Sequence, residues 1–362
     1  GNAHAYLILA RSTRNPVRTH GELWGRARAA LSRMQIGRVA RRAISGVDAK
    51  QRTYRLARGS TGAGRNASHL CSSAKALHCQ HRSVVRGSIP FEGSRKLRFE
   101  VHEARGASEQ WGMVWTHGVS GSMRNESDGG WPFAGVTTLA DIMPVARYDA
   151  RGHGISDSPM TSSCTWSAMG KDLLKLKRAW GRKHTVLAGT SMGTAASLFA
   201  ILEDPTGIDG LILATPPTCY AQRKKFLPMY QSSVDLARAS GLEAAKQDAS
   251  QRAKPPIFLE SEQGRATFDV GWRQKFAMGL DRYCAAFEGA MMSDFPPVEQ
   301  LRTITVPTLV LAWRSDVQHP LETAKMLQRT LPDAELHVAR TWKDIEEFPQ
   351  VMRTFLHRCV AE

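Results

Sequence analysis

The sequence lacks several features that would define whole classes of protein. None of its six cysteines belongs to a C-x-x-C pair, so their spacing indicates neither a zinc site nor a disulfide framework. No apolar run reaches the roughly 18 residues of a membrane-spanning helix. No interleaving of aromatic and basic residues indicates nucleic-acid binding. We therefore expect a protein of a reducing compartment with no metal, no cofactor, no nucleic-acid partner and no transmembrane segment.

Acidic residues are nearly absent from the first 90 residues, which contain 17 lysines or arginines but only Glu22 and Asp48. The remainder has 32 basic and 31 acidic residues, so this segment provides nearly all of the net charge of +16. Such an arginine-rich, acid-poor leader is typical of a transit peptide to a mitochondrion or plastid. One alternative is an arm that binds nucleic acid or an anionic membrane, and another is a disordered tail or translated upstream sequence. Without a transit peptide the protein would be cytoplasmic.

The basic leader, residues 1–84, is expected to be dispensable for folding. Its excess of positive charge opposes compaction, and its apolar residues follow no sustained period. A chain that starts near residue 84 should therefore keep the thermal midpoint of the full chain. A drop of more than a few degrees on truncation would mean that the leader packs on the body.

The rest of the chain alternates between short apolar runs and helical patterns such as 169–180 and 321–331. The strand-like runs are 83–89, 97–102, 113–116, 144–148, 185–188, 211–213, 308–312 and 335–339. This alternation predicts an α/β fold with a mostly parallel sheet flanked by helices. The long helical interval 216–296 follows a strand, so we expect an inserted lid there. Residues 85–215 and 297–362 would then form the core.

Ser191 occupies the most informative of the strand ends. Sites in parallel sheets form at the carboxyl ends of strands. Here a G-x-S-x-G sequence follows an apolar strand and precedes a helical pattern, which is the context of a nucleophile elbow. Gly189 and Gly193 provide the small side chains that such a tight turn needs. Three other strand ends carry clusters of Gly, His, Ser or Asp, beginning at residues 117, 149 and 316.

Four motifs in order, H-G at 117, D-x-R-G-H-G-x-S at 149, G-x-S-M-G at 189 and D-x-x-H-P at 316, resemble those of the α/β-hydrolase superfamily. The resemblance covers about residues 85–362. It implies that Ser191 is a nucleophile and Asp316 the acid of a catalytic triad. The backbone N–H groups of Val119 and Met192 would form the oxyanion hole. The implied activity is hydrolysis of a carboxylic ester or related acyl small molecule.

The sequence departs from the family pattern at the catalytic base. When Glu347-Phe348-Pro349 is aligned with the usual ending of the last loop, Trp342 stands where the family has its histidine. His319, three residues after Asp316 and near the carboxyl edge of the sheet, is the best substitute. The triad would then be degraded or rearranged.

The other histidines have structural interpretations. His117 and His153 lie in motifs whose histidine usually holds loops, and His337 falls in the middle of a strand. Asp316 itself has an alternative, because a carboxylate there could cap the helix that starts near Pro320. Without a base, the chain would be a very slow hydrolase or a scaffold that binds a small apolar ligand. Relatives resembling enol-lactone hydrolases and cofactor-free haloperoxidases provide a third hypothesis.

The helical interval 216–296 carries an aromatic stripe at helical spacing. Its members are Phe268, Trp272 and Phe276, followed by Leu280, Tyr283 and Phe287. We expect this stripe to pack between lid and body. Any members that line a pocket would favour an apolar substrate, such as an acyl or aryl ester. The basic residues Arg223, Lys224 and Lys225 are expected on a solvated helix face.

Overall fold

Eight strands form one sheet in the order β1-β2-β4-β3-β5-β6-β7-β8. The computed structural model describes residues 82–159 and 164–361. The strands are β1 (Arg82–Glu92), β2 (Arg95–Ala104), β3 (Trp111–Thr116), β4 (Val145–Tyr148), β5 (His184–Thr190), β6 (Ile208–Ala214), β7 (Thr308–Trp313) and β8 (Ala334–Ala339). Strand β2 pairs antiparallel with β1 and β4, and every other pair is parallel. The mostly parallel sheet expected from the sequence is therefore confirmed.

Strand β1 begins at Arg82, within the range expected for the leader. Its first residues pair with the end of β2, where Arg82 lies opposite Ala104. The sequence analysis marked a strand-like run from residue 83, so this run and the expected leader overlap at residues 83 and 84. The truncation described above should therefore retain Arg82; the rest of the leader lies outside the described residues.

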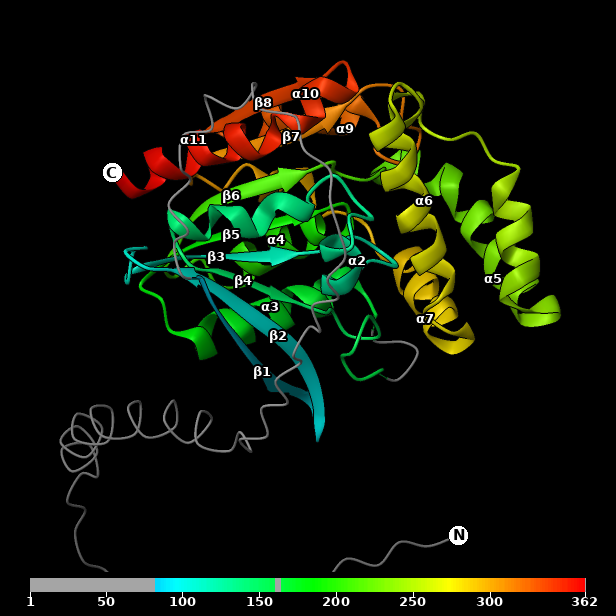
Figure 1. Cartoon of the computed structure of the whole chain (residues 1–362), viewed down its shortest axis with the longest axis horizontal. Coiled ribbons are helices and arrows are strands. Elements are labelled where there is room, and N and C mark those ends of the chain that lie inside the picture. Colours follow the sequence, from blue (N-terminus) through cyan, green and yellow to red (C-terminus); the bar gives the residue numbers. More distant parts are fainter. Residues whose placement is uncertain (1–81, 160–163, 362) are drawn as a thin grey trace, which may run out of the picture. The chain divides into compact units, whose positions relative to one another are not determined.

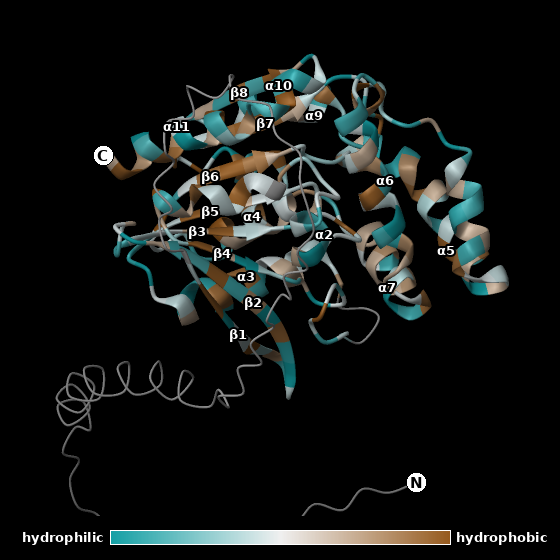
Figure 2. Ribbon diagram, in the orientation of Figure 1, coloured by the Kyte–Doolittle hydropathy of each residue, from teal (hydrophilic) through white to brown (hydrophobic). Residues whose placement is uncertain are grey.

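Helices cover both faces of the sheet (Figure 1). One face packs against α3 (Trp166–Trp180), α4 (Met192–Glu203) and α9 (Leu321–Thr330). The other packs against η1 (Ala134–Asp141), α10 (Trp342–Glu346) and α11 (Phe348–Ala361). Because successive strand side chains point to opposite faces, Val186 and Leu187 enter different cores. Strand β6 is accordingly brown over most of its length in Figure 2, whereas β3, which contains two tryptophans, is paler.

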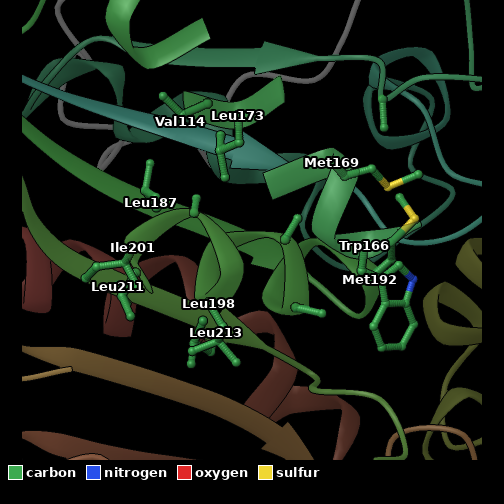
Figure 3. Packing of buried hydrophobic residues seen from close by; sticks show 14 of the residues in the cluster. Val114, Trp166, Met169, Leu173, Leu187, Met192, Leu198, Ile201, Leu211 and Leu213 are labelled. Carbon is green, nitrogen blue, oxygen red and sulfur yellow. The ribbon is translucent and has the colours of Figure 1, made fainter. Parts of the chain in front are cut away.

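The core between the sheet and helix α4 is formed by aliphatic side chains. Leu198 of α4 lies next to Leu213 of β6, and Ile201 lies next to Leu211 (Figure 3). All four side chains are almost completely buried. Burial of this size stabilises the fold by about 1.5–3 kcal/mol for each such side chain. Helix α4 is therefore held firmly, and with it the turn that precedes it.

Residues 216–296 form a helical insertion made of α5 (Tyr220–Ser250), η3 (Pro256–Leu259), α6 (Glu262–Phe276) and α7 (Leu280–Met291). Helix α5 is broken at Gly241, whose φ of 84° is not helical. In Figure 1 the labelled helices α5, α6 and α7 lie beyond the arrowheads of β3 and β6, toward the carboxyl ends of the strands. The insertion is therefore at the edge of the sheet where sites form.

The expectation of a solvated basic face on α5 is wrong for Arg223, although Lys224 and Lys225 are exposed. The Arg223 guanidinium is buried, donates to the carbonyls of Ser293 and Ala290, and stacks on Trp166 at 3.9 Å. Carbonyls at the end of a neighbouring helix are ready acceptors, so this arginine joins α5 to the end of α7.

Gly193 permits helix α4 to approach strand β3. A Cβ atom at this position would lie 2.2 Å from the carbonyl oxygen of Thr116, and one on Gly189 would lie 2.8 Å from the same oxygen. A backbone carbonyl inside a parallel sheet cannot move aside without breaking the ladder. Both positions therefore exclude any side chain, which agrees with the interpretation of the turn from the sequence.

Substitution of Gly193 by alanine should lower the free energy of unfolding by about 1–3 kcal/mol, the usual cost of overpacking. Denaturant unfolding would measure the change. Gly135→Ala is a matched control, because its Cβ would meet only Pro349 Cγ at an ordinary 3.6 Å. Equal stability of the two variants would contradict the steric argument.

Candidate active site

Ser191 lies at the tip of the turn between β5 and α4. Its φ of 51° and ψ of −114° are outside the regions that non-glycine residues normally adopt. Its backbone N–H donates to the carbonyl of Ala214 at 3.0 Å, so the neighbouring strand holds the strained conformation in place. The side chain is 8% exposed and stands at the amino terminus of α4, where the helix dipole favours negative charge.

Ser191, His319 and Asp316 form a continuous hydrogen-bonded chain. His319 Nε2 lies 2.9 Å from Ser191 Oγ, and His319 Nδ1 lies 2.9 Å from Asp316 Oδ2. A carboxylate only accepts, so Nδ1 carries the proton of the neutral ring and Nε2 is free to accept from the serine hydroxyl. The three residues singled out in the sequence are thus brought together in the geometry of a nucleophile, a base and an orienting acid.

Asp316 is buried, yet its surroundings favour the carboxylate form. Burial alone would raise its pKa, but the charge and hydrogen bond of His319 and a hydrogen bond from Trp313 Nε1 at 3.0 Å lower the pKa to about 2. The backbone N–H groups of Gln318 and His319 also donate to it. The expected alternative, a cap for helix α9, is not observed, because Pro320 occupies the cap position without a side-chain hydrogen bond.

The loop after β3 brings Val119 to the same turn. A Cβ atom on the adjacent Gly118 would lie 3.3 Å from Ser191 Cβ, so loop and serine are in direct contact. The Met192 N–H has no intrahelical acceptor because Met192 is the first residue of α4. Within residues 82–159 and 164–361, no group accepts a hydrogen bond from the Val119 N–H. Two free donors therefore lie beside Ser191.

The remaining candidate histidines do not reach Ser191. His117 is buried; its Nε2 accepts from the Ala150 N–H and its Nδ1 donates to the Gly118 carbonyl, which fixes the loop before Val119. His153 donates through Nδ1 to the Arg151 carbonyl. His337 lies in β8 with its ring against Phe348.

Trp342, which the sequence alignment places at the family's histidine, packs in the core. Its indole is 6% exposed and lies against Phe258 of the insertion, with a centroid separation of 5.5 Å. Its Nε1 donates to Glu346. An indole has no basic nitrogen, so this position cannot supply the base.

Two tryptophans that the sequence analysis did not identify surround His319. Trp131 lies edge-on at 6.0 Å and donates through Nε1 to Thr190 Oγ1, which also lies 2.9 Å from Thr215 Oγ1. Trp313 lies at 6.3 Å and holds Asp316. These bulky rings restrict the imidazole to the orientation that reaches Ser191. In the sequence, the Gly129-Gly130 pair before Trp131 indicates a turn, but it does not indicate that Trp131 contacts His319.

A cavity of about 380 Å³ lies between the Ser191 turn and the helical insertion. Much of its wall is apolar and comes from the insertion and the loop before η1. The largest apolar contributors are Trp131, Met229, Phe258, Phe268, Trp272 and Phe287. The aromatic stripe is thus divided, because Phe268, Trp272 and Phe287 line the cavity while Tyr283 packs in the core between α5 and α7.

The described part of the chain contains no group of three His, Cys, Asp or Glu side chains placed to hold a metal ion. Its four cysteines, Cys164, Cys219, Cys284 and Cys359, are buried and free. No helix of this part is both long and apolar enough to cross a bilayer.

The chain belongs to the alpha/beta hydrolase family. Residues 113–346 match the sequence pattern of that family. This match includes Ser191, Asp316 and His319. The fold predicted from the resemblance of the four motifs is therefore confirmed. Most of the related sequences carry the names of hydrolases, although one is an ethanol acetyltransferase, and a hydrolase is therefore the general class for this chain.

Known proteins with related sequences or folds act on different bonds. The "Putative carbamate hydrolase RutD" of Caulobacter sp. (strain K31) is 26% identical over 243 residues, which cover 66% of this chain and 86% of that protein. The esterase RhEst1 from Rhodococcus sp. ECU1013 aligns with a TM-score of 0.58 and 21% identity, covering 76% of this chain and 98% of that one. The enol-lactonase from Burkholderia xenovorans LB400 aligns with a TM-score of 0.57 and 18% identity, covering 74% and 97%.

Burial of His117 and His153 should make the fold sensitive to acid. Burial, together with the nearby His117, lowers the pKa of His153 to about 3, and burial lowers that of His117 to about 4. The unfolded chain takes up these protons below pH 6.5 and the folded chain does not. Each group therefore contributes stability at neutral pH that is lost as the pH falls below 6.5, by about 1.4 kcal/mol per pH unit.

His153→Phe should remove one of the protons that the chain takes up on unfolding in acid, and stability should then depend less on pH. Urea unfolding of wild type and variant at pH 7 and pH 5 would measure the difference. The wild type should lose about 2 kcal/mol more than the variant over this interval. Groups of opposite sign, such as Glu126, whose pKa burial raises to about 7, are present in both proteins and cancel. If wild type and variant lose the same free energy of unfolding between pH 7 and pH 5, burial does not lower the pKa of His153.

Proposed function

We propose that this protein hydrolyses a carboxylic ester or related acyl small molecule through Ser191. The single observation that carries the proposal is the hydrogen-bonded chain from Ser191 Oγ through His319 to Asp316. A serine hydroxyl is a weak nucleophile unless a base takes its proton, and His319 Nε2 is within the distance that such a base requires.

Each residue of the chain would have a defined role in acyl transfer. Ser191 Oγ attacks the carbonyl carbon while His319 accepts the hydroxyl proton, and the ionised Asp316 stabilises the resulting imidazolium. The negative oxygen of the tetrahedral intermediate would lie against the Val119 and Met192 N–H groups. His319 then gives its proton to the leaving alcohol, and a water molecule repeats the sequence on the acyl-enzyme.

The cavity supports a substrate with a substantial apolar part. Aromatic and methionine side chains of the helical insertion face Ser191 across about 380 Å³, the size of a small-molecule site. The insertion would act as a lid that excludes water from the acyl-enzyme, as the sequence analysis expected. The carbamate, ester and enol-lactone bonds named for the related proteins are all attacked at an acyl carbon, which fits this class of reaction.

Ser191→Ala and His319→Ala should lower the turnover of 4-nitrophenyl esters by similar factors, about 10³ or more, because members of a catalytic unit fail together. A fluorophosphonate probe should label the wild type at Ser191. His337→Ala is the control; its imidazole packs against Phe348, so it should change stability more than turnover.

Turnover that survives His319→Ala but disappears in Ser191→Ala would reject His319 as the base. Undetectable turnover in wild type and both variants, with Ser191 unlabelled, would instead favour the alternative of a hydrolase-like scaffold that binds a small ligand.

A further inference from the structure

One cation in the cavity wall has no counter-ion. Lys275, near the end of α6, lines the same cavity as Ser191 and His319. Its ammonium group lies over aromatic rings, 4.9 Å from the centroid of Phe287 and 5.5 Å from that of Phe276. In the part of the chain that the structure describes, no carboxylate lies within 4 Å of it and no acceptor receives its hydrogen bonds.

The acidic side chains that line the cavity are already engaged elsewhere. The exposed Asp269 pairs with Lys254 at 3.5 Å, and Asp316 accepts from His319 Nδ1 at 2.9 Å. Glu126, which also lines the cavity, accepts from Trp115 Nε1, and burial raises its pKa to about 7. None of these carboxyl groups therefore neutralises Lys275.

The environment of Lys275 opposes its charge. Burial, with a smaller repulsion from Arg252, lowers the pKa of the ammonium to about 8. An unpaired charge among apolar groups destabilises the protein. A ligand that brings a counter-ion to this charge is therefore bound more tightly. Arg252 lines the same wall, where it pairs with Asp248 at 2.5 Å and donates to Ser233 Oγ at 3.0 Å.

We infer that Lys275 forms an anion subsite, and that the substrate is an acyl compound carrying a carboxylate distant from the bond that Ser191 attacks. A half-ester of a dicarboxylic acid has this chemistry, with a methylene chain suited to the aromatic wall between the two polar ends. The inference rests on the proposed hydrolase function and adds a substrate class to it. An ammonium with three donors binds a carboxylate by charge and hydrogen bonds together.

The test compares mono-4-nitrophenyl glutarate with its neutral methyl ester. Both release 4-nitrophenolate from the same acyl chain and differ in one negative charge. The wild type should show a kcat/KM at least about tenfold higher for the anionic ester, the effect of one hydrogen-bonded charge pair. Lys275→Met should abolish this preference, so that the ratio of the two kcat/KM values falls to about one. Lys275→Arg should retain it.

Lys225→Met is the matched control. Lys225 is an exposed residue of α5 outside the cavity, and its substitution changes the net charge by the same amount. Thermal unfolding should show that Lys275→Met keeps or raises the midpoint, since it removes an unpaired charge. A wild type that prefers the neutral ester, or a preference that persists in Lys275→Met, would overturn the anion subsite while leaving the hydrolase function intact.

Failure of the hydrolase function is distinguished by a binding measurement. If neither ester is hydrolysed, titration calorimetry with the 4-nitroanilide of glutaric acid tests the subsite alone. Binding by the wild type that falls about tenfold in Lys275→Met supports the subsite without catalysis. Absence of binding to the wild type, or equal binding to both proteins, overturns it.

Discussion

The hydrogen bond between His319 and Asp316 is the interaction on which the candidate site depends. It fixes the tautomer of the imidazole, lowers the pKa of the carboxyl group, and turns Nε2 toward Ser191. Both residues belong to one short loop after β7, so their separation is set by local backbone geometry. Trp131 and Trp313 then confine the ring from the sides. The strained turn between β5 and α4 then presents Ser191 to this imidazole.

The same sheet edge also explains why the insertion faces Ser191. The chain leaves β6 at its carboxyl end, and residues 216–296 return to the sheet only before β7. They therefore cover the edge where the turns after β3, β5 and β7 meet. The aromatic side chains of this insertion provide apolar wall, and Lys275 is a cation set among them. A single inserted segment can thus set the polarity of the cavity without altering the residues that hold Ser191.

Local sequence signals predicted most of the fold and the three hydrogen-bonded residues. Apolar runs marked the strands, and the G-x-S-x-G turn required glycine at the two positions that contact Thr116. His319 was predicted from its distance of three residues from Asp316. The environment of Lys275 and the contact of Trp131 with His319 had no such signal, because they depend on segments far apart in the sequence. Arg223 was expected to be exposed, because a run of basic residues does not reveal which of them donates to the carbonyls at the end of a neighbouring helix.

Placement of Asp316 and His319 in one loop frees the last part of the chain from positioning either of them. Strand β8 lies at one edge of the sheet and most of its side chains are only half-buried, so it is open to local fraying. In a protein whose base follows β8, each fraying event would displace that base from the serine. Here the distance between His319 and Ser191 is set across β5, β6 and β7 in the interior of the sheet. In the proposed reaction, motion of the carboxyl-terminal strand would therefore not disturb proton transfer.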